Sequence, residues 1–503
     1  MKGTNKMTKT EALNLLLEKI EVNHYLSMAS ALMAWDARTI GIPEKSMTAR
    51  GAATGWLRGE TFRRFIAPET LEAIETLESF DNELTQIERA MTRELGLRYR
   101  KIKAVPPAEY QAFMALTSEA EPVWEAAREK RDFAMILPYY EKVFEFQRKL
   151  CDWYGYKKHP YDALLDEYER GANVDMLDKF FGALRNNISP LIRDIINSGK
   201  QPEAITGSFD IDKQRSMMPW LTGFTGFDLT RGKFGEVEHP FCISVDINDV
   251  RITTKYHKDN LLAGLYGIIH ECGHAIYDQN FDENLIKYDL ADGASFGIHE
   301  SQSRLYENNI GRSRAFMEIL LPELRNTFEY FNDWDEEKLY KAINISKPSL
   351  IRIEADELTY SLHIMVRYEL EKALITGDIK VSDLPGLWDA KYEELLGVRA
   401  DDIAKGVLQD VHWSAGYVGY FPSYAVGSAY GAQFVGAMKK SVDIDAAVRK
   451  VDLTPVNDWL KANVQKFGNM YEPHELLINA TGEEFNPDYY VNYLKNKYTA
   501  LYS

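Results

Sequence analysis

The chain has 503 residues, of which 45% are hydrophobic and 27% are charged, a composition typical of a globular protein. It carries 59 basic and 76 acidic residues, so the formal net charge is −17, and neither nucleic acid nor an anionic membrane is an expected partner. The cysteines are scattered at 151, 242 and 272, which favours a reducing, cytoplasmic environment over a disulfide framework. No apolar run reaches the roughly 18 residues of a membrane span.

Helical spacing of apolar residues dominates the chain. Thr8 or Thr10 is expected to cap a first helix, which ends before Pro43. Similar periodicity predicts helices over about 68–99, 107–130, 134–154 and 173–198. No shift in composition indicates a domain boundary. The sequence therefore predicts a mainly α fold, with one large helical domain over 1–503. We expect about 1–200 to form one wall of a cleft and about 201–503 to carry the chemistry.

One segment departs from this helical pattern. Apolar and polar residues alternate from Phe241 to Ile247, and Val250–Thr254 follows a turn signal at Asn248-Asp249. Alternation with a period of two predicts a β-hairpin. An isolated hairpin is marginally stable, so we expect this one to pack on helices.

The strongest chemical signal is His270-Glu271-Cys272-Gly273-His274, an H-E-x-x-H motif. Asp259 is expected to cap its helix, which has an apolar face. Residues four apart share a helical face, so both imidazoles can bind one ion, and zinc favours such ligands. Glu271 would then take the proton from a zinc-activated water. The alternative is a pair of surface histidines, and Cys272 is interpreted as a packing residue.

A catalytic zinc needs a third protein ligand. Glu300 is the first candidate, because the chain after His274 is long enough for a turn and a second helix. His299 is its rival, and Asp278 and Asp292 are weaker rivals. An exposed glutamate at the start of a helix is the alternative interpretation of Glu300.

Several further motifs occur in order along the chain. They are His239-Pro240-Phe241, Asp249–Thr253 (D-x-R-x-T), His299–Ser303 (HESQS), Ile351–Asp356 (I-R-x-x-A-D), Gly406–Trp413 (G-x-x-Q-D-x-H-W) and Gly419–Tyr424. Together with the HECGH motif, they resemble the carboxypeptidase Taq family of metallocarboxypeptidases.

The resemblance implies a helical fold around a deep substrate groove, with the small hairpin beside the metal helix. It implies one divalent metal per chain, zinc or alternatively cobalt, and usually a homodimer. It also implies release of C-terminal residues from peptides with broad specificity, with proline disfavoured. His270, His274 and Glu300 would be the metal ligands and Glu271 the general base.

Such an enzyme must recognise a free terminal carboxylate, for which bidentate arginine is well suited. Arg352 is the first choice, on a helix expected to begin near Pro348. The alternative is a solvated helix face with an Arg352–Asp356 pair. Arg251 is the second choice; it would line the groove or, as we slightly prefer, brace the metal helix.

The tetrahedral intermediate needs a hydrogen-bond donor toward its oxyanion. The resemblance suggests Tyr420 and His239, while Tyr424 and His412 are further candidates. The alternative for Tyr420 is simple aromatic packing in a glycine-rich turn. The residue types of Gln409, Asp410 and Trp413 suggest groups that orient the others.

Two other functions remain open from the sequence. A metallo-endopeptidase or oligopeptidase can use the same motif and a downstream glutamate. A non-catalytic peptide-binding protein could hold a structural metal, although such a site has no need of Glu271.

Overall fold

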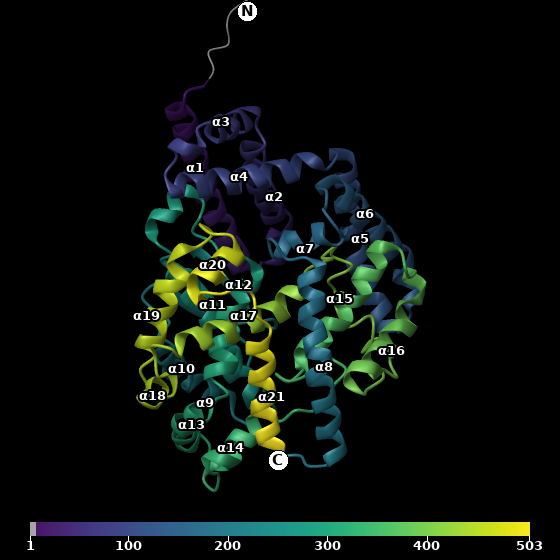
Figure 1. The fold of residues 1–503 in the computed structure, drawn as a ribbon, viewed down its shortest axis with the longest axis vertical. Helices are drawn as coiled ribbons and strands as arrows, with labels where there is room; N and C mark the ends of the chain where they lie inside the picture. Colours follow the sequence, from purple (N-terminus) through teal and green to yellow (C-terminus); the bar gives the residue numbers. More distant parts are fainter. Residues whose placement is uncertain (1–6) are drawn as a thin grey trace, which may run out of the picture.

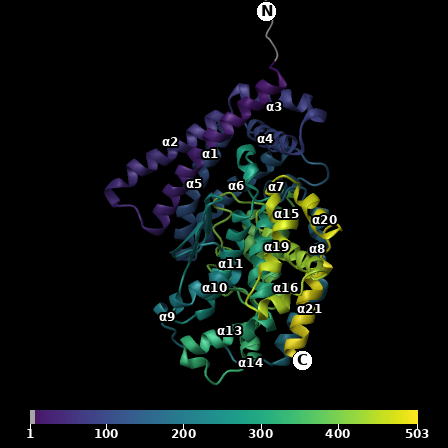
Figure 2. The same ribbon diagram turned by 90° about the vertical axis from the view of Figure 1, so that its left-hand side faces the viewer.

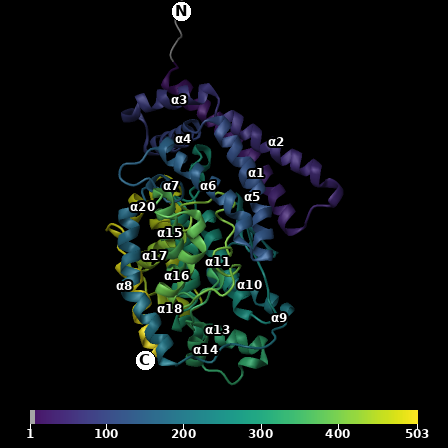
Figure 3. The same cartoon turned by 90° about the vertical axis from the view of Figure 1, so that its right-hand side faces the viewer.

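The computed structural model describes residues 7–503, and helices dominate it (Figure 1). The helices at one end of the molecule are α1 (Lys9–Thr39), α2 (Met47–Phe65), α3 (Pro68–Ser79) and α4 (Gln86–Ala104), with 3-10 turns η1 (Glu44–Ser46) and η2 (Asp81–Glu83). Figures 2 and 3 show α1 and α2 running side by side at this end, far from the C-terminus.

Local capping explains where these helices begin. Thr8 caps α1: its hydroxyl accepts a hydrogen bond from the Glu11 amide, while the Glu11 carboxylate accepts one from the Thr8 amide. The expected single helix over 68–99 is wrong, because the chain turns after Ser79. A second capping box, formed by Thr85 and Glu88, then starts α4.

The next helices agree closely with the apolar periodicity. They are α5 (Pro107–Lys130), α6 (Phe133–Tyr154), α7 (Asp162–Tyr168), α8 (Val174–Ser198), α9 (Ile211–Ser216) and α10 (Met218–Thr225). Asn173 caps α8, and its side chain accepts a hydrogen bond from the Met176 amide.

A small sheet precedes the metal-binding motif. As predicted, β2 (Cys242–Asp246) and β3 (Asp249–Thr254) pair in antiparallel fashion. A further strand that was not predicted, β1 (Gly232–Glu236), pairs with β3 in parallel and completes the order β1-β3-β2. Its sequence Gly-Lys-Phe-Gly-Glu has no apolar alternation. Val250 and Ile252 of β3 are fully buried, and this strand packs on α11.

The motif helix is α11 (Leu261–Gln279), and its N-cap is Asn260 rather than the expected Asp259. The Asn260 side chain accepts a hydrogen bond from the Ala263 amide. After η3 (Glu283–Tyr288), the chain enters α12 (Phe296–Arg304), which continues into the π-helical turn η4 (Leu305–Ile310).

The C-terminal helices complete the molecule. They are α13 (Arg314–Thr327), α14 (Glu336–Ile343), α15 (Tyr360–Thr376), α16 (Leu384–Leu396), α17 (Pro422–Met438), α18 (Ile444–Arg449), α19 (Thr454–Asn463), α20 (Pro473–Thr481) and α21 (Asp488–Tyr502). Short turns η5 (Glu329–Phe331), η6 (Arg352–Glu354), η7 (Val381–Asp383) and η8 (Gln465–Phe467) separate some of them. Most of α17 is buried, and it packs along α12.

The expected helix beginning near Pro348 is wrong. Arg352 lies in η6, and α15 begins only at Tyr360. The Asp356 carboxylate accepts hydrogen bonds from the backbone amides of Lys347, Leu358 and Thr359, and so stabilises a loop in place of the helix start.

Buried apolar side chains form two clusters. The smaller cluster joins α1–α4 to Leu285 and Leu290. The larger one extends from α5 to α21, so α5–α8 share a core with the later helices. Among the helices of residues 7–503, none combines the length and the apolar character needed to cross a bilayer.

Candidate metal centre

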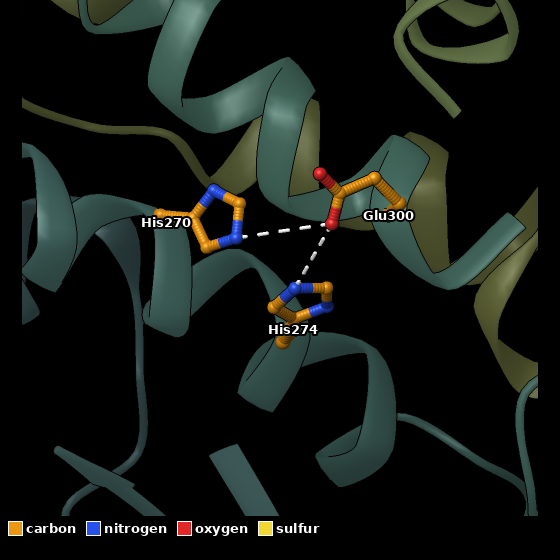
Figure 4. A group of neighbouring side chains, drawn as sticks. All are labelled: His270, His274 and Glu300. Carbon is orange, nitrogen blue, oxygen red and sulfur yellow. Dashed lines mark ion pairs between the residues drawn. The ribbon is translucent and has the colours of Figure 1, made fainter. Parts of the chain in front are cut away.

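Two helices bring His270, His274 and Glu300 together (Figure 4). Glu300 Oε2 lies 3.4 Å from His274 Nε2 and 3.8 Å from His270 Nε2. Ligand atoms about 2.0–2.2 Å from one zinc ion have separations of this order in a tetrahedral site. Two imidazoles and a carboxylate are also a catalytic donor set, so these residues fit a divalent metal ion.

The second nitrogen of each imidazole is already engaged. His270 Nδ1 lies 2.9 Å from Glu307 Oε2 in η4. Arg304 Nε donates to Glu300 Oε1 at 2.7 Å, and Arg304 Nη1 donates to Glu307 Oε2 at 2.9 Å. Sequence reasoning did not identify Glu307 and Arg304. The available signal was their helical spacing from Glu300, which places all three on one face.

His274 is oriented by a second chain of polar contacts. Its Nδ1 lies 2.6 Å from Nδ1 of His299, whose Nε2 lies 2.9 Å from Asp278 Oδ1. His299 and Asp278, the rival ligands, therefore stand behind His274 in this structure. Asp292, the remaining rival, lines the adjoining cavity.

The electrostatic surroundings suit metal binding and proton transfer. Burial lowers the pKa of His274 to about 4, which keeps its imidazole neutral at pH 7. Burial opposes ionisation of Glu300, but Arg304 and the two histidines outweigh it and hold the pKa of Glu300 well below its usual range. Burial raises the pKa of Glu271 to about 7, which suits a group that takes and returns a proton near neutral pH.

A cavity of about 590 Å³ opens over this cluster. Such a volume is typical of a small-molecule or peptide site. Glu271, Tyr420 and Tyr424 line it beside the three candidate ligands, and so do Asp166, Glu167 and Tyr168 from the last turn of α7.

The remaining candidates lie outside the lining of this cavity. His239 is exposed in the loop between β1 and β2, although its neighbours Pro240 and Phe241 do line the cavity. His412 packs behind the wall, with its ring centroid 4.4 Å from that of Phe421. Arg251 donates to Asp249 at 2.6 and 2.7 Å and lies over the ring of Trp35. It therefore joins β3 to α1.

Arg352 is only 6% exposed and belongs to a buried charge cluster. Its Nε and Nη2 donate to Asp410 Oδ1 at 3.0 and 2.9 Å. Arg367 donates to the other oxygen of Asp410. The alternative interpretation, a solvated Arg352–Asp356 pair, is therefore wrong, because two buried arginines share Asp410 instead. The Arg352 guanidinium lies 5.2 Å from the Tyr424 ring centroid, directly behind the cavity wall.

A buried glutamate that sequence reasoning did not identify supports the segment before Tyr420. Glu371 Oε1 accepts a hydrogen bond from Trp413 Nε1 at 2.6 Å. Its Oε2 accepts one from the Gly419 amide at 2.8 Å and another from the Tyr161 hydroxyl. The loop that carries Tyr420 is thereby fixed to α15 and, through Tyr161, to the start of α7.

Comparisons with known proteins identify the family of this chain. The family described as carboxypeptidase Taq (M32) metallopeptidase matches residues 15–498. Carboxypeptidase 1 of Bacillus subtilis (strain 168) is 42% identical over 487 residues, which cover 96% of each chain. Thermostable carboxypeptidase 1 of Pyrococcus furiosus is 34% identical and covers 97% of this chain and 99% of its own.

Solved structures give the same result. The Pyrococcus furiosus carboxypeptidase structure superimposes with a TM-score of 0.94 at 34% identity, covering 97% of this chain and 99% of its own. Trypanosoma cruzi metallocarboxypeptidase 1 gives a TM-score of 0.93 at 33% identity over the same shares. These matches confirm the resemblance and the mainly helical fold. The chain is therefore a metal-dependent carboxypeptidase and belongs to the carboxypeptidase Taq (M32) family of metallopeptidases.

Proposed function

We propose that His270, His274 and Glu300 hold one zinc ion per chain, with cobalt as the alternative, and that the enzyme releases C-terminal residues from peptides. The single observation that carries this proposal is that one ligand atom from each of the three residues lies within 4.8 Å of the other two in the lining of an open cavity. When bound, such an ion polarises a carbonyl and acidifies water.

Glu271 acts as the general base in this proposal. It lines the cavity beside the ligands, and its pKa of about 7 lets its carboxylate accept a proton from the attacking water. The same group then returns the proton to the departing amine. General-base catalysis of this kind contributes about 10²–10⁴-fold to a rate.

Tyr420 donates a hydrogen bond to the developing oxyanion. Its side chain lines the cavity, and burial raises the pKa of Tyr420, so the hydroxyl keeps its proton. Tyr424 stands beside it, with ring centroids 5.1 Å apart. His239, the other candidate from the resemblance, is exposed and is the weaker choice.

Arg352 supplies the attraction for the terminal carboxylate, with His412 and Tyr424 beside it. Two guanidinium groups, of Arg352 and Arg367, share the single carboxylate of Asp410, and positive charge is left in excess within this cluster. The cluster lies behind Tyr424 at the cavity wall. A free carboxylate is favoured there, whereas an amide is not. Arg251, which is paired with Asp249, remains a secondary candidate.

One experiment tests the whole proposal. A peptide is incubated with the protein with its C-terminus free or amidated, with and without a chelator, and the products are measured by mass spectrometry. We expect stepwise loss of C-terminal residues from the free peptide alone, stopped by chelation and restored by zinc or cobalt. Internal cuts in both peptides would indicate an oligopeptidase. No cleavage by metal-loaded protein would indicate a non-catalytic peptide-binding protein.

Three further properties follow from the family rather than from the site. We propose broad specificity with proline disfavoured at the C-terminus, a homodimer, and a cytoplasmic location, which the free cysteines favour. Peptides that differ only in their last residue would test the specificity, and sedimentation would test the assembly.

A further inference from the structure

A second cavity, of about 740 Å³, lies between α2, α5, α6 and the loop 415–418. Its lining includes Phe62, Tyr110, Met114 and Tyr417, which are 44%, 51%, 48% and 51% exposed. Burying large apolar side chains stabilises a folded protein, so most of them lie inside it. Several of them left exposed around one cavity indicate a surface that binds an apolar ligand.

This apolar cavity adjoins the metal cavity, because Glu167 and Tyr168 line both. Aromatic rings continue across the junction. The ring centroid of Tyr420 lies 6.0 Å from that of Tyr417 and 5.1 Å from that of Tyr168. The rim of the apolar cavity therefore lies about one side chain away from a peptide bound against Tyr420.

One wall of the apolar cavity is rigidly built. Gly416 has a φ of +82°, and a Cβ there would lie 2.6 Å from the Phe113 ring. Its carbonyl accepts a hydrogen bond from Gln147 Nε2 at 2.8 Å. The rings of Phe113 and Phe146 stack with centroids 3.9 Å apart. Loop 415–418 is thus held against α5 and α6, and the cavity is a preformed feature.

We propose that the apolar cavity binds apolar side chains of the peptide on the N-terminal side of the cleaved bond. This assignment rests on the proposed function. A carboxypeptidase releases one residue, which must lie beside the metal ligands, whereas the rest of the peptide must extend to solvent. The apolar cavity continues from the metal cavity and reaches the surface at Tyr110 and Met114, so it fits that remaining segment.

The test compares peptides that share their released residue but carry phenylalanine or serine at the second to fourth positions upstream of it. The variant Tyr110→Gln/Met114→Gln replaces two exposed side chains one helical turn apart on α5 with a polar residue that favours helix. Tyr25→Gln/Leu32→Gln is the matched control, with two exposed side chains on α1 outside both cavities.

We expect the preference in kcat/KM for the phenylalanine peptides over the serine peptides to fall about tenfold in the α5 variant, the lower end of the range that loss of an apolar contact produces. The α1 control should stay within twofold of the wild type. An unchanged preference in the α5 variant would overturn the proposal. A change in kcat/KM that depends only on which residue is released would also overturn it. Loss of dimerisation with the preference retained would identify the cavity instead as an interface between copies of the chain.

A binding measurement separates this proposal from the proposed function. The same substitutions are made in a Glu271→Gln background, and the Kd of each peptide is measured by calorimetry. A Kd about tenfold weaker for the phenylalanine peptides supports the apolar cavity even if the wild type cleaves nothing. Equal Kd values with and without the α5 substitutions would overturn it, whatever the activity.

Discussion

Two buried glutamates of the site, Glu271 and Glu300, are each 7% exposed but differ in ionisation. Burial raises the pKa of Glu271 to about 7, while Arg304 and the histidines hold that of Glu300 well below its usual range. A pair of carboxyl groups whose surroundings separate their pKa values can take different roles. Glu300 is suited to remain an anionic ligand, and Glu271 to exchange a proton.

Replacing Glu271 with glutamine should reduce kcat by about 10²–10⁴-fold, because the amide cannot accept the proton of the attacking water. The zinc content of the variant, measured by mass spectrometry of the metal, should remain one ion per chain. Glu72→Gln, at an exposed position on α3 outside both cavities, is the control and should retain the activity. Near-normal turnover by Glu271→Gln would contradict the assignment of Glu271 as base.

Glu371 should make stability depend on pH. Burial raises its pKa to about 7 from an ordinary 4.5, so the folded state binds more protons than the unfolded state between these values. The stability it contributes is present below about pH 4.5 and is lost as pH rises through about 7, with a total of about 3 kcal/mol. Urea unfolding at pH 5 and pH 8 measures the free energy of unfolding at each pH. Between these two pH values, this free energy should fall less in the Glu371→Gln variant than in the wild type. Equal losses in both proteins would refute this linkage.

At the scale of elements, the close approach of α12 and α17 positions a metal ligand. Gly427 faces α12, and a Cβ on it would lie 2.7 Å from Cβ of Glu300 and 3.0 Å from the Gly297 carbonyl oxygen. Neither contact is a normal van der Waals distance, so any larger residue must push the two helices apart. The glycine is therefore required by packing and not by an unusual φ.

Gly427→Ala should displace α12, cost about 1–3 kcal/mol of stability, and weaken zinc affinity about 10–100-fold. Competition with a chelating dye measures the affinity, and urea unfolding measures the stability. Gly182→Ala on α8, where no atom lies within 4 Å of the added Cβ, is the control. That change should be neutral or slightly stabilising, because alanine favours helix. If the Gly427→Ala variant bound zinc with wild-type affinity, α12 could move without loss of zinc binding.

The elements that local rules predict are those with strong periodicity or caps. The helix α5, the hairpin of β2 and β3, and the H-E-x-x-H helix were all predictable. β1 was not, because its own sequence has no apolar alternation and only its pairing with β3 holds it in the sheet. The start of α15 was misplaced because a loop stabilised by the Asp356 side chain overrides helical spacing. The sequence also could not show that Glu307, beyond the end of α12, turns back onto His270.

At the scale of the whole molecule, the candidate metal centre lies in the larger core while a second cluster covers one end. α11 and α12 contribute to the larger cluster, and the turn η3 between them contributes to the smaller one. The segment that joins the two histidines on α11 to Glu300 on α12 therefore packs against the N-terminal helices. This arrangement couples the first hundred residues to the metal centre although none of them lines its cavity.

Because the ligands come from two helices of the folded core, zinc should bind the folded state in preference to the unfolded chain. At a zinc concentration 1,000 times Kd, this preference adds about 4 kcal/mol. An unfolding entropy of about 2.1 cal/mol/K per residue gives about 1 kcal/mol per degree for 503 residues, so Tm should rise by about 4 °C over the chelated protein. Calorimetry of both forms measures the shift. His274→Ala removes one donor and should abolish it, whereas an equal shift in that variant would place the stabilising zinc elsewhere on the molecule.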